Sequence, residues 1–141
     1  MIFQKNKTIE LFDKFSLTIP TKLKHHQDEI SNTKALFITD RFESFVISFE
    51  EGMADMTKQE NDEDKKTTFE YREDGKCIRL CRSVPETPSS TGGYAFFSIE
   101  LECHGEKIQL NGQMTAKPGY KWSDNIEPTL ITILQGIRIK T

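Results

Sequence analysis

Apolar side chains recur at every second position between Thr67 and Thr115, and this alternation constrains the fold more than any other feature. It runs through four successive segments, marked by Phe69 and Tyr71, Ile78 and Leu80, Phe97 with Ile99 and Leu101, and Ile108 with Leu110. Strict alternation is typical of antiparallel strands that bury one face of a sheet. Asp74-Gly75 and His104-Gly105 provide turn residues between neighbouring segments. The sequence therefore predicts a four-stranded meander in this region.

Two further hairpins are expected before the meander. The first joins Ile9–Phe12 to the alternating segment Phe15–Ile19, and the second joins Ala35–Thr39 to Phe42–Glu50. The stretch between them, Thr21–Ser31, is polar and has few apolar residues. A short helix is the structure that we predict for this stretch.

One segment near the end of the sequence has the periodicity of a helix. Its apolar residues fall three or four positions apart, at Ile126, Leu130, Ile133, Leu134 and Ile137. Gly136 suits a left-handed residue that ends the helix, and Ile137 and Ile139 then alternate as in a short strand. Strands followed by a helix predict an α+β fold, with a curved, mainly antiparallel sheet of six to eight strands and the helix packed on it. The 141 residues fit a single domain, 1–141.

The charges are distributed unevenly along the chain. Nineteen basic and 22 acidic side chains give a net charge of −3, so there is no basic field to attract nucleic acid. Seven acids and three bases lie between Glu50 and Lys66. We interpret residues 51–66 as an acidic, flexible insert within the domain, and the alternative is an acidic docking surface.

Three features bear on cellular location. Residues Met1–Lys7 contain no apolar run that could act as a secretion signal, and no stretch approaches the roughly 18 apolar residues of a membrane span. Three cysteines, an odd number, agree with a reducing compartment. The expectation is a cytoplasmic protein without a membrane span.

The cysteines and histidines do not suggest a metal or catalytic centre. Four residues along a strand span ~13 Å, so Cys77 and Cys81 share a face without meeting. Cys103 follows the alternation of the buried residues and is expected in the core, and its neighbour His104 would face the other way. No P-loop, H-E-x-x-H, G-x-S-x-G or dinucleotide-binding motif is present. We therefore expect no cofactor, no metal and no enzymatic activity. An enzyme built from scattered carboxylates or from a cysteine remains the alternative.

Three aromatic residues are candidates for a binding surface. Phe96 neighbours Phe97, which belongs to the buried side of its strand, so Phe96 must lie on the opposite face. Tyr120 and Trp122 lie in a loop before the helix, where Trp122 could instead pack the start of the helix against the sheet. Tyr and Trp are frequent in binding surfaces. Apolar residues on both faces predict a partly covered, three-layer arrangement.

Four segments resemble the Mog1/PsbP-like superfamily, whose members are small α/β/α sandwiches. They are FSLTIP (Phe15–Pro20), SFVISFE (Ser44–Glu50), GYAFFSIELECHGEKIQLNGQM (Gly93–Met114) and PTLITILQGIRI (Pro128–Ile139). The chain departs from the family pattern in having Gln135-Gly136 in place of a small polar residue, and in lacking a tryptophan after Pro20. The resemblance implies a non-catalytic adaptor, because members bind a nuclear-transport factor, assist photosystem assembly or act as bacterial effector chaperones. No binding residue transfers from the family.

These observations together favour a binding module that holds a protein partner on a face or rim of its sheet. Phe96, Tyr120 and Trp122 are the residues expected at that surface. The alternative is a small-molecule-binding protein with an apolar pocket between the sheet and the helix.

Overall fold

The structure, a computed structural model, describes residues 5–58, 67–73, 75–83, 93–117 and 127–140. These residues form two antiparallel sheets and one α-helix. The elements in chain order are β1 (Asn6–Leu11), β2 (Phe15–Pro20), β3 (Lys24–Ile30), β4 (Thr33–Thr39), β5 (Phe45–Glu50), the 3-10 helix η1 (Met56–Lys58), β6 (Thr67–Glu73), β7 (Lys76–Ser83), β8 (Tyr94–Cys103), β9 (Glu106–Ala116), α1 (Glu127–Gln135) and β10 (Arg138–Ile139). The expected α+β class is confirmed.

The larger sheet has seven strands in the order β3-β4-β5-β9-β8-β7-β6. The predicted meander is confirmed, because β6, β7, β8 and β9 are consecutive neighbours. The β8–β9 hairpin turns at His104 and Gly105, with φ of 51° and 80°, as a two-residue turn between right-twisted strands requires.

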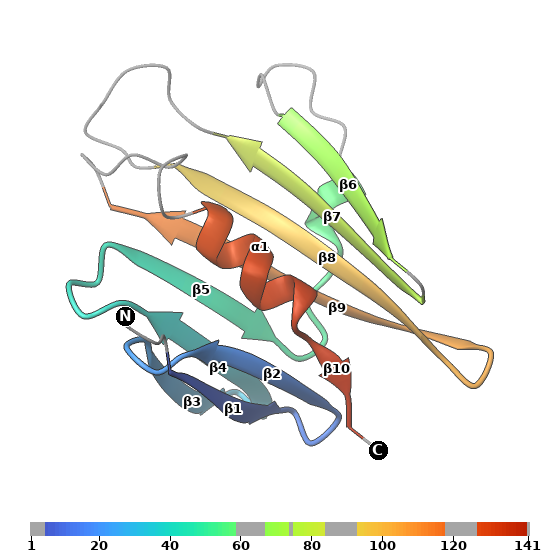
Figure 1. The fold of residues 1–141 in the computed structure, drawn as a ribbon, viewed down its shortest axis with the longest axis horizontal. Helices are drawn as coiled ribbons and strands as arrows, with labels where there is room; N and C mark the ends of the chain where they lie inside the picture. The colour runs from blue at the N-terminus through green and yellow to red at the C-terminus, as the bar shows by residue number, and fades with distance from the viewer. Residues whose placement is uncertain (1–4, 59–66, 74, 84–92, 118–126, 141) are drawn as a thin grey trace.

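The opening hairpin belongs to a separate, three-stranded sheet in the order β1-β2-β10. Arg138 pairs with Ser16, and Ile139 pairs with Phe15. The described strands therefore form two sheets, whereas the sequence predicted one. The three-stranded sheet and α1 lie on the same face of the seven-stranded sheet (Figure 1).

The hydrophobic core fills the space between these two layers. Its largest fully buried side chains are Phe49, Phe97, Leu11, Leu17, Ile19, Leu36, Ile38, Ile47, Leu80, Ile99, Met114 and Leu130. The rings of Phe49 and Phe97 meet edge to face, with centroids 5.2 Å apart. Gly112 on β9 lies beneath the ring of Phe97, which occupies the space that a side chain at this position would need.

Three expectations about local structure are wrong. Residues 24–30 form strand β3 and not a helix, since β4 pairs with their backbone over the whole length of the strand. Cys103 is half-buried at the end of β8, outside the core, because the buried side of the strand ends at Leu101. Gly136 has no left-handed conformation.

The C-terminal end of α1 is closed by hydrogen bonds that need no left-handed residue. The Gly136 N–H donates to the carbonyl of Thr132 at 3.2 Å. Lys76 Nζ donates to the Gln135 carbonyl at 2.6 Å, and Arg138 donates to the same oxygen at 2.9 Å. Two cations at the negative end of the helix dipole thus satisfy its terminal carbonyl.

Candidate functional site

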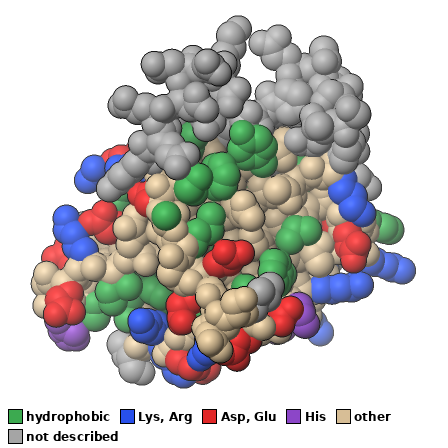
Figure 2. Space-filling model, turned by 180° about the vertical axis from the view of Figure 1, so that it is seen from behind, with side chains coloured by type: hydrophobic (Ala, Val, Ile, Leu, Met, Phe, Trp, Pro, Cys, Tyr) green, Lys and Arg blue, Asp and Glu red, His purple; other side chains and the backbone are tan. Residues whose placement is uncertain are grey.

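The face of the seven-stranded sheet that points away from the core carries a small group of apolar side chains. Val46 on β5 is opposite Thr115 on β9, which is in turn opposite Tyr94 on β8. Val46, Tyr94 and Phe96 are half-buried, and the rings of Tyr94 and Phe96 meet edge to face with centroids 5.6 Å apart. We call Val46, Tyr94 and Phe96 the second-face patch. Figure 2 views the molecule from behind and shows hydrophobic side chains gathered in the upper middle of this face.

Phe96 therefore lies on the face that the alternation assigns to it. It neighbours Gln113 on β9 and Cys81 on β7, and Cys81, which shares this face of the sheet, is buried. Tyr120 and Trp122, the other two predicted binding residues, lie outside the described residues. Of the three candidates, the structure thus places Phe96.

The sequence reasoning missed Tyr94 as a companion of Phe96. Both residues stand on β8 two positions apart, so their side chains point to the same face. The alternation that separates Phe96 from Phe97 assigns Tyr94 to the same side, and this signal was available in the sequence.

Residues 53–58 cover part of the second face through a polar network. The Asn111 side chain donates from Nδ2 to the Met53 carbonyl at 2.8 Å. Gln109 Nε2 donates to Asp55 Oδ2 and to Ser98 Oγ, each at 2.8 Å. Asp55 has a side chain only 12% exposed, and it lies 3.9 Å from a guanidinium nitrogen of Arg79. These contacts fix the first part of the acidic segment to β7, β8 and β9. Residues 59–66 of the predicted insert lie outside the described residues.

The ion pairs continue from Arg79 to the edge of the sheet. Arg79 Nη2 lies 3.4 Å from Glu70 Oε2, and Arg72 Nε donates to the other oxygen of Glu70. The hydrogen bond from Arg72 is the main reason that the pKa of the Glu70 carboxyl lies below its usual value, although burial acts in the opposite direction. Because each of these charges has a partner of opposite sign, the network is suited to holding structure in place.

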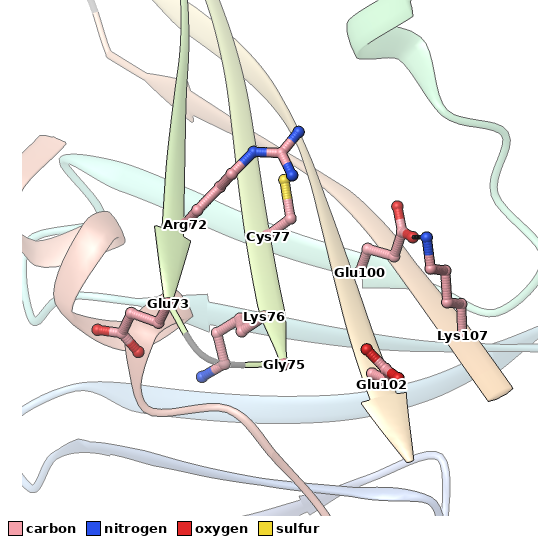
Figure 3. Close-up of a pocket in the computed structure, with 8 residues that line it drawn as sticks. All are labelled: Arg72, Glu73, Gly75, Lys76, Cys77, Glu100, Glu102 and Lys107. Atoms are coloured by element: carbon pink, nitrogen blue, oxygen red, sulfur yellow. Dashed lines mark ion pairs between the residues drawn. The ribbon is translucent and has the colours of Figure 1, made fainter. Parts of the chain in front are cut away.

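A hollow of about 180 Å³ lies at the end of the sheet near the β6–β7 turn (Figure 3). Its lining residues carry both signs of charge, and they are Arg72, Glu73, Gly75, Lys76, Cys77, Glu100, Glu102 and Lys107. Lys107 pairs with Glu100 at 3.3 Å. Burial raises the pKa of the Cys77 thiol, so Cys77 does not have the lowered pKa of a reactive cysteine.

Two further hollows lined by described residues hold about 190 and 290 Å³. All three are smaller than the roughly 300–1,000 Å³ of typical small-molecule sites. Their walls are mixed, with charged side chains such as Lys14, Glu51 and Lys34 beside apolar ones. This geometry gives little support to an apolar ligand pocket at these positions.

Among the described residues, no helix is long and apolar enough to cross a membrane. No protein-family model, no curated protein and no solved structure matches this chain. The resemblance to the Mog1/PsbP-like superfamily therefore stays a prediction, and the fold itself supports only the α+β class.

Proposed function

We propose that this chain is a non-enzymatic binding module that holds a protein partner on the second face of its seven-stranded sheet. The observation that carries the proposal is the edge-to-face pair of Tyr94 and Phe96, which is half-buried on the side of the sheet opposite the core. Aromatic side chains at a surface of this kind add contact area without the entropy loss of long flexible chains, and they often dominate binding energy.

The surroundings of the patch fit a protein ligand. Gln113 and Thr115 stand between the patch residues on β9 and can exchange hydrogen bonds with a partner at the rim. The resemblance to a superfamily of adaptors, stated above on sequence grounds, points in the same direction. Tyr120 and Trp122 remain proposed members of the same surface.

The alternative, a small-molecule pocket between the sheet and the helix, has less support. The residues of α1 that face the sheet, Leu130, Ile133 and Leu134, are fully buried within one continuous core cluster. The described hollows lie elsewhere, are small and have charged walls.

A capture experiment with a matched control tests the proposal. The tagged protein and its Phe96→Ser and Phe12→Ser variants are incubated with extract of the source cells, and the retained proteins are identified by mass spectrometry. Phe12 is also half-buried, but it lies in the β1–β2 turn and packs against the core. Circular dichroism and thermal melting establish that each variant is folded.

We expect a protein that is retained by the native chain and by Phe12→Ser but not by Phe96→Ser. Titration with the purified partner should then show binding weakened roughly 30-fold by Phe96→Ser, as for truncation of an aromatic hot spot. Tyr94→Ser should act similarly, and Tyr120→Ser and Trp122→Ser extend the test to the remaining candidates. Equal retention by all folded variants, or retention of nothing by the native chain, would count against the proposal.

A further inference from the structure

Strand β6 forms one edge of the seven-stranded sheet, and the hydrogen-bond pattern reveals which of its backbone groups face outward. The Glu102 N–H donates to the Gly75 carbonyl at 2.9 Å, so the polar backbone groups of Gly75 face β8. Successive residues of a strand direct these groups to opposite sides, so those of Lys76 face β6, where Lys76 is paired with Glu73. The N–H and C=O groups of Glu73 therefore face β7. Because the direction alternates along β6, those of Tyr71 also face β7, whereas those of Arg72 and Glu70 point away from it.

The side chains of β6 differ from those of the opposite edge of the sheet. On β3, the described side chains from Lys24 to Glu29 are all exposed and polar, a composition that discourages pairing of edge strands. On β6, the sequence TTFEYRE is rich in residues that favour strands. Tyr71 is 39% exposed and is one of the two exposed large hydrophobic residues among those described.

The sequence of β6 is self-complementary when two copies run antiparallel. A two-fold axis at Tyr71 places Glu70 of each copy opposite Arg72 of the other, and these are the residues whose backbone groups face outward. Both conditions for an antiparallel pair are met, because the backbone donors and acceptors face each other and the opposed charges differ in sign. An axis at Glu70 would also align outward-facing groups, but it would place the two Glu70 carboxylates opposite each other.

We propose that two copies of this chain associate through β6, antiparallel and with the two-fold axis at Tyr71, so that the sheet continues from one copy into the other. This isologous contact pairs each edge with its own copy and leaves no unpaired β6 edge. It uses a different surface from the second-face patch, so its failure would leave the proposed function untouched.

Charge reversal tests the contact in solution. Sedimentation velocity over a wide range of concentrations should show a concentration-dependent dimer for the native chain. In a dimer of Arg72→Glu chains, or of Glu70→Arg chains, residues 70 and 72 carry the same charge, so both of the equivalent 70–72 pairs become repulsive. Each substitution should therefore weaken the dimer at least about tenfold. An equimolar mixture of the two variants restores opposite charges in both positions and should form a heterodimer, visible by native mass spectrometry. A monomeric native chain, or a dimer that both variants leave intact, overturns the proposal.

Disulfide trapping tests the register and does not depend on the stability of the charge variants. In a background in which Cys77, Cys81 and Cys103 are replaced by serine, Tyr71→Cys should form a covalent dimer under mild oxidation. Directly opposed Cα atoms in a pair without mutual hydrogen bonds are ~4.5 Å apart, within the reach of a disulfide. In the Glu70→Cys variant the two Cα atoms at position 70 are diagonal neighbours, ~7–8 Å apart. In the Gln27→Cys variant the cysteine lies on the β3 edge, away from the contact. Both variants should therefore remain largely unlinked. Preferential linking through either of these controls overturns the proposal.

Discussion

Substitution of Gly112 by alanine tests the packing of the core at a crowded point. A Cβ atom at this position would lie 2.6 Å from Cε2 of Phe97, and it would come still closer to Cζ of the same ring and to the Ser48 carbonyl oxygen. The ring could shift only by disturbing its edge-to-face contact with Phe49, and the carbonyl belongs to the backbone of the neighbouring strand β5. Neither obstacle can give way easily.

The magnitude follows from these two obstacles. Adding a methylene to a packed core costs typically 1–3 kcal/mol, and here one of the two obstructing groups is backbone, so we expect Gly112→Ala to lower the free energy of unfolding by about 3 kcal/mol. That is a large part of the 5–15 kcal/mol of a typical domain. Urea denaturation followed by circular dichroism measures this difference, provided that the dependence on urea is unchanged.

Gly136→Ala is the matched control, because it makes the same chemical change after the end of α1. A Cβ atom there would meet its nearest neighbours at 3.6 Å, an ordinary contact, and the backbone has no positive φ. This variant should be unchanged or more stable by up to about 1 kcal/mol, because alanine restricts the unfolded chain. A Gly112→Ala protein within 1 kcal/mol of the native chain would refute the reasoning about the crowded site.

Three further predictions concern polar contacts. Burial is the main cause that lowers the pKa of the Lys76 ammonium in the folded protein below its ordinary value of 10.5. The unfolded chain therefore binds more protons than the folded one as the pH approaches 10.5. The free energy of unfolding of the native chain, relative to that of Lys76→Met, should then rise with pH in this range. Denaturation at a series of pH values measures it, and a fall would mean that the hydrogen bond to Gln135 outweighs burial. Gln109→Ala should cost about 1 kcal/mol and speed hydrogen exchange in η1, because Asp55 loses its 2.8 Å donor; unchanged exchange would count against this anchor. Because burial raises the pKa of Cys77 above 9.0, its alkylation by iodoacetamide should still accelerate beyond pH 9, and a plateau below that value would contradict the assignment.

The sequence predicted the elements that have one buried face. In β8 the contrast between Phe97 and Phe96 defines the inner and outer sides, and α1 has an equally clear apolar stripe. The strand β3 could not be recognised in this way, because as an edge strand with exposed side chains it has no alternation. Ser31 and Asn32, residue types that are common in turns, were the signal of a hairpin that the sequence offered. In the structure they form the β3–β4 turn with φ of 51° and 64°.

Contacts between distant parts of the sequence were beyond prediction. Asp55 meets Gln109 and Arg79 only because the strands β7 to β9 bring these residues together beneath the acidic segment. Similarly, local alternation indicates that β1 and β2 are strands, but it does not indicate that they form a separate sheet with β10. That depends on the pairing of the β2 backbone with β10, which comes after all the other elements in the sequence.

The pairing of β2 with β10 has a consequence for the folding of the chain during synthesis. The meander from β6 to β9 has contacts of low sequence separation and can form as soon as its strands leave the ribosome. The core face of the large sheet is not fully covered until α1 and β10, which follow all the other elements, have also emerged. Nascent chains that stall before residue 127 therefore lack the core residues Leu130, Ile133, Leu134 and Ile137 and leave part of the core exposed, so they should be the species that molecular chaperones engage.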